Sequence, residues 1–251
     1  MRKQKTERGI VVVVSGIHSV TKALEYGFGL KLYIASEKIA SRLVSLRASA
    51  EKKGCEVFIG KLPDSTEGNA SQGVVLEISR PKCLSEKKLY FQILETSETH
   101  FLLILDGVTD PRNFGACLRT AVSYGVTGVI IAKDNSAPLN EAAFKASSGA
   151  AAMVPIYEVV NLARCITNLK KRGIWVFGAD VSADDLLDKA ALSGNLALVM
   201  GSEGKGIRKN VKKNCDSLLR ISLKNGELSL NVSVATGICL NEIYRQQQLE
   251  S

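Results

Sequence analysis

Apolar runs and amphipathic stretches alternate regularly through the second half of the chain. Five short apolar runs predict strands of a parallel sheet with both faces covered; they occupy residues 101–105, 126–132, 153–156, 174–179 and 196–200. The stretches between and after them predict helices; these begin near Asn113 and cover residues 141–148, 161–172 and 232–244. Alternation of this kind predicts an α/β fold with a mostly parallel sheet and helices on both faces.

The first part of the chain predicts a smaller α/β unit over residues 9–79. Strands are expected at residues 10–14, 30–35, 55–59 and 74–78, and helices at 20–26 and 37–53. Residues 1–8 carry several basic side chains and almost nothing to bury, so they read as a basic arm. Charges and Pro81 lead us to predict a linker over residues 80–97 and the second domain over 98–251.

Composition narrows the functional classes. Hydrophobic residues at 45% and charged residues at 23% are ordinary for a globular protein, while 33 basic against 25 acidic residues fit a nucleic-acid partner. Charge alone is weak evidence, because many basic proteins never bind RNA. The six cysteines form no C-x-x-C pair and there are two histidines, so we expect reduced thiols in the cytoplasm and no metal site. The apolar run Ile10–Val14 is too short to span a membrane.

Two glycine-bearing stretches follow predicted strands. Asn113 and Gly115 lie where a helix begins at the carboxyl end of a strand, which is where open α/β sheets bind ligands, and Arg119 follows on the same helix. The turn Gly201–Gly206 lets a backbone approach a ligand closely, yet it is neither a P-loop nor a dinucleotide fingerprint. Alone, it is as often a generic turn as a nucleotide site. Glu203 alone reads as a helix-capping acid, and Ser229 as the cap of the last helix.

Three stretches, in order, resemble the motifs of one family. They are Asn113-x-Gly-x-x-x-Arg119-x-Ala121, Leu198-Val-Met-Gly-Ser-Glu-Gly-Lys-Gly206 and Leu228-Ser-Leu-Asn-Val-Ser-Val-Ala-Thr-Gly-Ile-Cys239. The chain thereby resembles the SpoU-type ribose 2'-O-methyltransferases of the SPOUT class. That resemblance implies a SPOUT-type parallel sheet with a deep trefoil knot, and a homodimer formed through the helices of the first and third motifs. It also implies an amino-terminal substrate-binding domain, on the residues Ser15–Val20 and Ser71-Gln72-Gly73.

The resemblance further implies an activity: S-adenosylmethionine (AdoMet) donates a methyl group to a ribose 2'-oxygen, that of a guanosine in 23S rRNA. Alternatives are a tRNA ribose 2'-O-methyltransferase and a non-catalytic RNA-binding factor for ribosome assembly. The implied catalytic residues are Asn113, Arg119, Glu203, Ser229 and Asn231, and the implied cofactor-binding residues are Gly201, Ile221 and Leu230, with no metal. Because arginine stays protonated, we expect Arg119 to act as a cation that orients phosphate and stabilises the oxyanion.

Overall fold

A computed structural model describes residues 11–25, 27, 29–63, 72–79, 82–224 and 229–249. The described residues form two compact units, one within 1–82 and the other within 83–251. The predicted basic arm, residues 1–8, lies outside the described residues, as does Ser71. None of the described helices is long and apolar enough to cross a membrane.

The first unit is a mixed four-stranded sheet with helices. Its strands are β1 (Val11–Ser15), β2 (Gly29–Ile34), β3 (Glu56–Ile59) and β4 (Val74–Ser79), in the order β1-β4-β2-β3, and its helices are α1 (Ile17–Glu25), α2 (Glu37–Ala40) and α3 (Val44–Lys52). β4 is antiparallel to both its neighbours, while β2 and β3 are parallel. Leu32, Leu76 and Leu24 are almost fully buried, so sheet and helices share one core.

Two details of this unit differ from or extend the sequence reading. The single helix predicted over residues 37–53 is two helices, because Leu43 leaves the helical conformation at φ −115° and ψ 31°. The break lets both Ala40 and Leu46 turn inward. The backbone amide of Ile17 donates to Gln72 Oε1 at 3.0 Å, so the two stretches that carry the resemblance of this unit meet in the fold.

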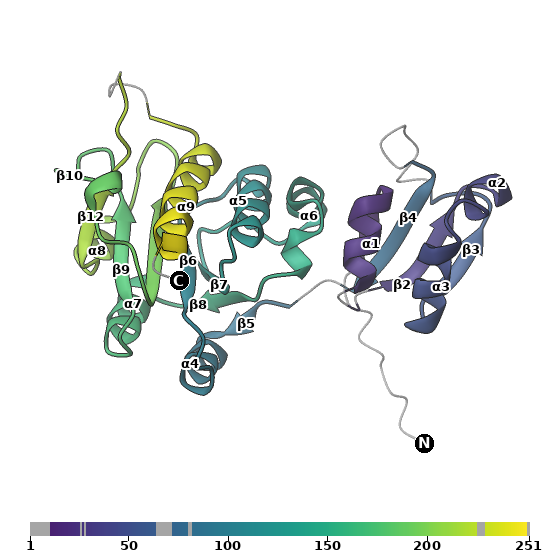
Figure 1. Ribbon diagram of the computed structural model, residues 1–251, viewed down its shortest axis with the longest axis horizontal. Helices are drawn as coiled ribbons and strands as arrows, with labels where there is room; N and C mark the ends of the chain where they lie inside the picture. Colours follow the sequence, from purple (N-terminus) through teal and green to yellow (C-terminus); the bar gives the residue numbers. More distant parts are fainter. Residues whose placement is uncertain are drawn as a thin grey trace. The chain divides into compact units, whose positions relative to one another are not determined.

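The second unit contains a parallel sheet of eight strands (Figure 1). These are β5 (Leu84–Ser85), β6 (Phe101–Asp106), β7 (Gly128–Ala132), β8 (Ile156–Val159), β9 (Trp175–Ala179), β10 (Asp185–Leu186), β11 (Leu196–Gly201) and β12 (Ser217–Arg220). Their order is β10-β12-β9-β11-β6-β7-β8-β5, and every pair is parallel. The predicted α/β class with a parallel sheet is confirmed, and the trefoil knot stays a prediction.

Helices cover both faces of this sheet. They are α4 (Glu86–Glu95), α5 (Pro111–Ser123), α6 (Glu141–Ser147), α7 (Leu162–Lys170), α8 (Lys209–Lys212) and α9 (Val232–Leu249). Leu102 and Ile104 of β6 share a core with α4, α7 and α8. Leu103 and Leu105 are equally buried and point to the opposite face, since side chains alternate along a strand. On that side α5 contacts both α6 and α9 (Figure 1).

Several boundaries depart from the sequence reading. The range 80–97, predicted as a linker, contains β5 and α4, whose buried Leu89 and Ile93 belong to the second unit. The strand predicted at 153–156 is β8, at 156–159, because a short 3-10 helix at Ala150–Ala152 precedes it. Strands β10 and β12 were not predicted from the sequence. Both are short, and in β12 two leucines lie between the polar Ser217 and Arg220.

Candidate active site

A cleft opens at the carboxyl ends of β9, β11 and β12. We refer to this depression as the cleft, and its walls combine apolar side chains with the backbone of glycines. The lining residues are Ala179, Asp180, Val181, Met200, Gly201, Ser202, Glu203, Gly204, Gly206, Leu219, Arg220, Ile221, Leu223, Ser229, Leu230, Val232 and Ala235. All three predicted cofactor-binding residues, Gly201, Ile221 and Leu230, are among them. The cleft therefore lies where parallel α/β sheets bind ligands.

The glycine turn after β11 folds back on itself. Ser202 and Gly206 exchange backbone hydrogen bonds of 3.2 and 2.9 Å, and Gly204 and Gly206 have φ values of 77° and 63°. A Cβ atom on Gly201 would lie 2.1 Å from the carbonyl carbon of Gly206 and 2.2 Å from the nitrogen of Ile207. No side chain fits there, so one wall of the cleft depends on glycine at this position.

Asn113, Glu203 and Asn231 meet at the cleft although they are far apart in the sequence, and we call them the polar cluster. Glu203 Oε1 accepts from Asn113 Nδ2 at 3.0 Å and from Asn231 Nδ2 at 2.5 Å. Asn231 Nδ2 also lies 3.1 Å from Asn113 Oδ1, and the Val232 amide donates to Glu203 Oε1 at 3.4 Å. One carboxylate thus orients two amide side chains and the start of α9.

Asn231 also caps α9. The backbone amide of Ser233 donates to Asn231 Oδ1 at 2.9 Å, which is the hydrogen bond of a helix N-cap. The prediction that Ser229 caps this helix is therefore wrong, because Asn231 occupies the N-cap position. Ser229 instead lies exposed in the lining of the cleft.

Arg119 does not join the polar cluster. It is exposed on α5, six residues after Asn113, which places it about 120° around the helix and about 9 Å along it. In the described part of the chain no acid or other side chain pairs with its guanidinium. Gly115, which the sequence places beside a ligand site, is buried against α6 instead: a Cβ there would lie 2.3 Å from the Ala143 carbonyl oxygen.

Two acids that the sequence reading missed anchor the site. Asp106, at the end of β6, is fully buried and accepts from the amide and Nε of Arg208 at 2.8 and 2.6 Å. Asp180, at the end of β9, pairs with Lys212 and accepts from the Ser182 amide at 2.9 Å. Burial alone would raise the pKa of Asp180, but hydrogen bonds from Lys212 and Ser182 hold that pKa below its usual value. A carboxylate at the end of an apolar strand was the available signal, but it shows neither that the acid is buried nor which cation pairs with it.

The described residues near the cleft support neither thiol chemistry nor metal chemistry. Cys117 on α5 lies 3.5 Å from Thr236 Oγ1 on α9, and burial raises the pKa of its thiol to about 11. At neutral pH it is a protonated, inaccessible group and not a nucleophile. Within the described residues there is no cluster of three or more His, Cys, Asp or Glu that would hold a metal ion.

Comparisons with known proteins agree on one family. A model of the SpoU rRNA Methylase family matches residues 100–241. The chain is 41% identical over 244 residues to the 23S rRNA (guanosine-2'-O-)-methyltransferase RlmB of Yersinia pestis. The aligned region covers 95% of this chain and 99% of that protein. Identity to RlmB of Escherichia coli K12 is 40% over 240 residues, covering 94% and 98% respectively.

A solved structure matches the fold over the full length. The SpoU methyltransferase AviRb from Streptomyces viridochromogenes, in complex with the cofactor AdoMet, superposes with a TM-score of 0.76 at 21% identity, covering 100% of this chain and 95% of that one. At that identity the likeness concerns the fold alone.

Proposed function

Because the chain belongs to the SpoU rRNA methylase family, we propose that it transfers a methyl group from AdoMet to a ribose 2'-oxygen, that of a guanosine in 23S rRNA. Curated relatives with this activity in their names align over nearly the whole chain at 40–41% identity. The observation that carries the proposal is the polar cluster, which places an oriented carboxylate and two amides beside a cleft built on glycine and apolar residues.

The cleft suits AdoMet by the chemistry of its lining. Leu219, Ile221, Leu223 and Leu230 offer apolar surface for a flat adenine ring. The backbone near Gly201 offers hydrogen-bonding groups that no side chain blocks. We assign Gly201, Ile221 and Leu230 to cofactor binding. When bound, AdoMet supplies the methyl group, activated by the positive sulfonium.

The polar cluster positions the ribose. Glu203 fixes the two amides, so that Asn113 and Asn231 present defined donors and acceptors, and the exposed Ser229 lines the adjoining cleft. A transfer without metal depends on alignment, and ideal alignment contributes roughly 7 to 11 kcal/mol to rate acceleration. The hydroxyl proton leaves to water or to a substrate phosphate, since arginine is a poor base.

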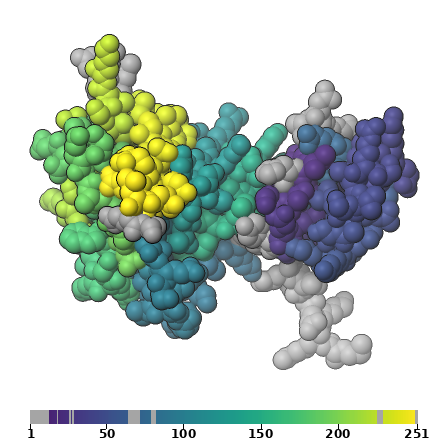
Figure 2. Space-filling model, in the orientation of Figure 1, coloured from purple at the N-terminus to yellow at the C-terminus, as the bar shows by residue number. Residues whose placement is uncertain are grey.

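Arg119 is the cation that stabilises the developing oxyanion, and it comes from the second protomer of a homodimer. Its exposure and its direction on α5, turned away from Asn113, support a role outside its own chain's cluster. The adjacent helix α9 presents Val234 and Ile238, exposed by 50% and 39% and spaced four residues apart. Tyr124, directly after α5, packs against Tyr244 of α9 with ring centroids 5.8 Å apart, so the ends of the two helices are in contact. Figure 2 shows α9, in yellow, at the surface of the second unit.

The enzyme works in the cytoplasm, where rRNA is made and assembled. Its first unit binds the substrate RNA. The hydrogen bond from the Ile17 amide to Gln72 supports this role of the first unit, because it joins the two stretches expected to form the RNA-binding surface. The excess of 33 basic over 25 acidic residues is consistent with the same partner.

Methyl transfer from labelled AdoMet to total rRNA and to total tRNA tests the proposed activity. We expect label in 23S rRNA, at the 2'-oxygen of one guanosine when the modified nucleotide is mapped. Label confined to tRNA would overturn the substrate and favour the tRNA enzyme. Failure to bind AdoMet in calorimetry would favour the non-catalytic assembly factor.

Mixed dimers test the shared site. Arg119→Ala and Asn231→Ser chains are each expected to lose about 100-fold in kcat as homodimers. A purified heterodimer of the two retains one intact site if Arg119 acts across the interface, so it should recover about half of the wild-type rate. A heterodimer as inactive as its parents would show that Arg119 serves its own chain.

A further inference from the structure

The segment Lys205–Lys213 is the most basic stretch beside the cleft, and we call it the basic segment. It contains five cations and no acid. Lys205 stands between Gly204 and Gly206, which both line the cleft, so the segment begins at the cleft's rim. It then continues through α8, whose Val211 is buried in the sheet's core. Its charges therefore lie next to the place where the proposed methyl transfer occurs.

Two of the five cations are already paired with buried acids. Arg208 Nε lies 2.6 Å from Asp106 Oδ1, and the Asp106 side chain has no exposed surface. Lys212 pairs with Asp180, whose side chain is 7% exposed. These two pairs anchor the segment to the ends of β6 and β9. Among the described residues, no buried acid pairs with the three remaining cations of the segment, Lys205, Lys209 and Lys213.

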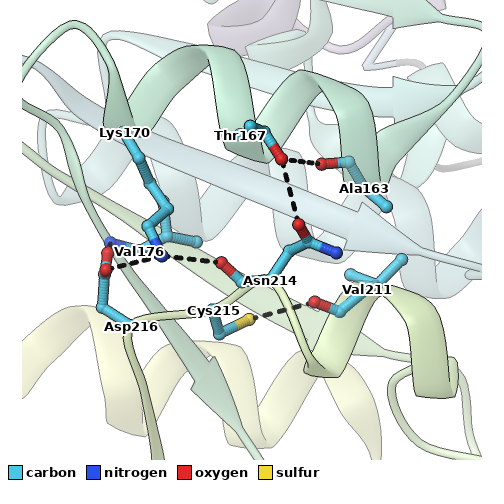
Figure 3. A network of polar contacts seen from close by, with 8 residues as sticks. All are labelled: Ala163, Thr167, Lys170, Val176, Val211, Asn214, Cys215 and Asp216. Carbon is cyan, nitrogen blue, oxygen red and sulfur yellow. Dashed lines mark hydrogen bonds and ion pairs between the residues drawn. The ribbon is translucent and has the colours of Figure 1, made fainter.

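Polar contacts fasten Asn214 and Asp216, which directly follow the basic segment, to α7 and β9 (Figure 3). Lys170 Nζ contacts Asp216 Oδ1 at 2.8 Å and the Asn214 carbonyl oxygen at 3.2 Å. The Thr167 hydroxyl donates to Asn214 Oδ1 at 3.0 Å, and the amide of Val176 donates to Asp216 Oδ2 at 2.8 Å. Held at both ends, the backbone presents its outward side chains from a fixed position, which reduces the entropy lost on binding.

Lys205, Lys209 and Lys213 are the outward cations, and Lys205 and Lys209 are the two that come first along the segment from the rim of the cleft. The side chains of Lys205 and Lys209 are both exposed, and across the described residues neither ammonium group makes a hydrogen bond or an ion pair. We propose that Lys205 and Lys209 bind the phosphate backbone of the RNA strand that flanks the target ribose. Phosphate is the chemistry that fits, because flexible ammonium groups on a fixed backbone act as point charges for it and carry no base preference. This assignment rests on the proposed function and specifies where its substrate lies.

The salt dependence of RNA binding tests the proposal without any methyl transfer. The probe is an unmodified 23S rRNA transcript, bound by wild type and by the Lys205→Ala/Lys209→Ala variant from about 50 to 200 mM salt. Each lost phosphate contact lowers the slope of log affinity against log salt by about 0.7 to 0.9. Two contacts therefore make the drop in affinity over this range roughly tenfold smaller than in wild type.

A second pair of exposed lysines provides the matched control. Lys87 on α4 and Lys171 after α7 are exposed and do not line the cleft, so Lys87→Ala/Lys171→Ala removes the same charge elsewhere. The control should keep the wild-type slope, and all three proteins should bind AdoMet equally, which shows that the cleft is intact. Equal slopes for the test variant and wild type, or equal losses in both variants, would overturn the proposal. Absent methyl transfer by wild type would instead count against the proposed function.

Discussion

The polar cluster and the cleft lie side by side, but they differ in the groups that form them. In the cluster, chemistry resides in side chains: Asn113, Glu203 and Asn231 come from three segments and meet through hydrogen bonds of 2.5 to 3.1 Å. In the cleft it resides in backbone and apolar surface, with Gly201 at the tightest point. Glu203 belongs to both, since it lines the cleft and accepts from both amides.

This difference predicts opposite patterns of tolerance. Where backbone binds a ligand, exchange of one apolar lining residue for another changes little, whereas an added atom at a glycine closes the site. Where side chains position a substrate, a small loss of one hydrogen-bonding group misaligns the reacting atoms without altering the fold. Substitutions in the two regions should therefore separate binding and stability from turnover.

The largest effect is expected from Gly201→Ala. The new methyl group would lie 2.1 Å from the Gly206 carbonyl carbon, and both this atom and the Ile207 nitrogen belong to backbone that is fixed by the Ser202–Gly206 bonds. We expect a loss of about 3 kcal/mol or more in unfolding free energy. AdoMet binding should fall below detection in calorimetry.

Gly237→Ala is the matched control for that substitution. Gly237 lies inside α9, and a Cβ there would meet only Thr120 Cγ2, at an ordinary 3.8 Å. Alanine is favoured over glycine in a helix by roughly 0.5 to 1 kcal/mol, so this variant should be slightly more stable than wild type in urea unfolding. If Gly201→Ala unfolded at the wild-type urea concentration and bound AdoMet, the tight turn would not be what shapes the cleft.

The sequence predicts well those elements whose residues are buried on every side. Phe101–Asp106 and Leu196–Gly201 are apolar runs that only a covered strand accommodates, and both lie at the centre of the sheet. The strands at the edges of the sheet and the segments that connect them were harder to predict. Helix α4 carries exposed Phe91 and several charges, so its two buried residues, Leu89 and Ile93, were hidden in what reads as a linker.

The candidate site was predictable as a set of residues but not as a geometry. Motif resemblance supplied Asn113 and Asn231, yet nothing in a separation of 118 residues indicates that their amides touch. The separation of Arg119 from Asn113 was predictable, because six residues along a helix turn two side chains about 120° apart. Asp106 and Asp180 were missed because a buried acid is recognisable only from its partner, and Arg208 and Lys212 lie in another segment.

Asn231 offers the next largest effect and separates its two roles. Asn231→Ala removes both the cap of α9 and the amide of the polar cluster, and should cost about 1 kcal/mol of stability as well as activity. Asn231→Ser keeps an oxygen that can cap the helix, but loses the amide donor to Glu203. We expect Asn231→Ser to regain wild-type stability while kcat stays about 100-fold low.

Steady-state kinetics and thermal unfolding on the same two variants check this expectation. AdoMet affinity should stay close to wild type in Asn231→Ser, because the residues assigned to the cofactor are Gly201, Ile221 and Leu230. Recovery of both stability and kcat in the serine variant would mean that Asn231 acts only as a cap, and that the polar cluster has no role in turnover.

The smallest effect concerns Asp180, whose pKa is held below its usual value of 3.8 by Lys212 and Ser182 in spite of burial. The stabilisation is complete above that value and is lost as the pH falls through the lower pKa of the folded state. At pH 7 we expect Asp180→Asn to be less stable than wild type by on the order of 1 kcal/mol, with the gap narrowing below about pH 4.

Urea unfolding at pH 7 and at pH 3 measures that gap, with Asp188→Asn as the matched control. Among the described residues, the one ion pair of Asp188 is with its neighbour Lys189, at 3.6 Å, and its side chain is 50% exposed, so its removal should change stability little at either pH. A gap for Asp180→Asn that is constant with pH would mean that this variant loses packing and not charge. The anchor of the basic segment on β9 would then depend on the shape of the Asp180 side chain, and the electrostatic account of that anchor would have to be given up.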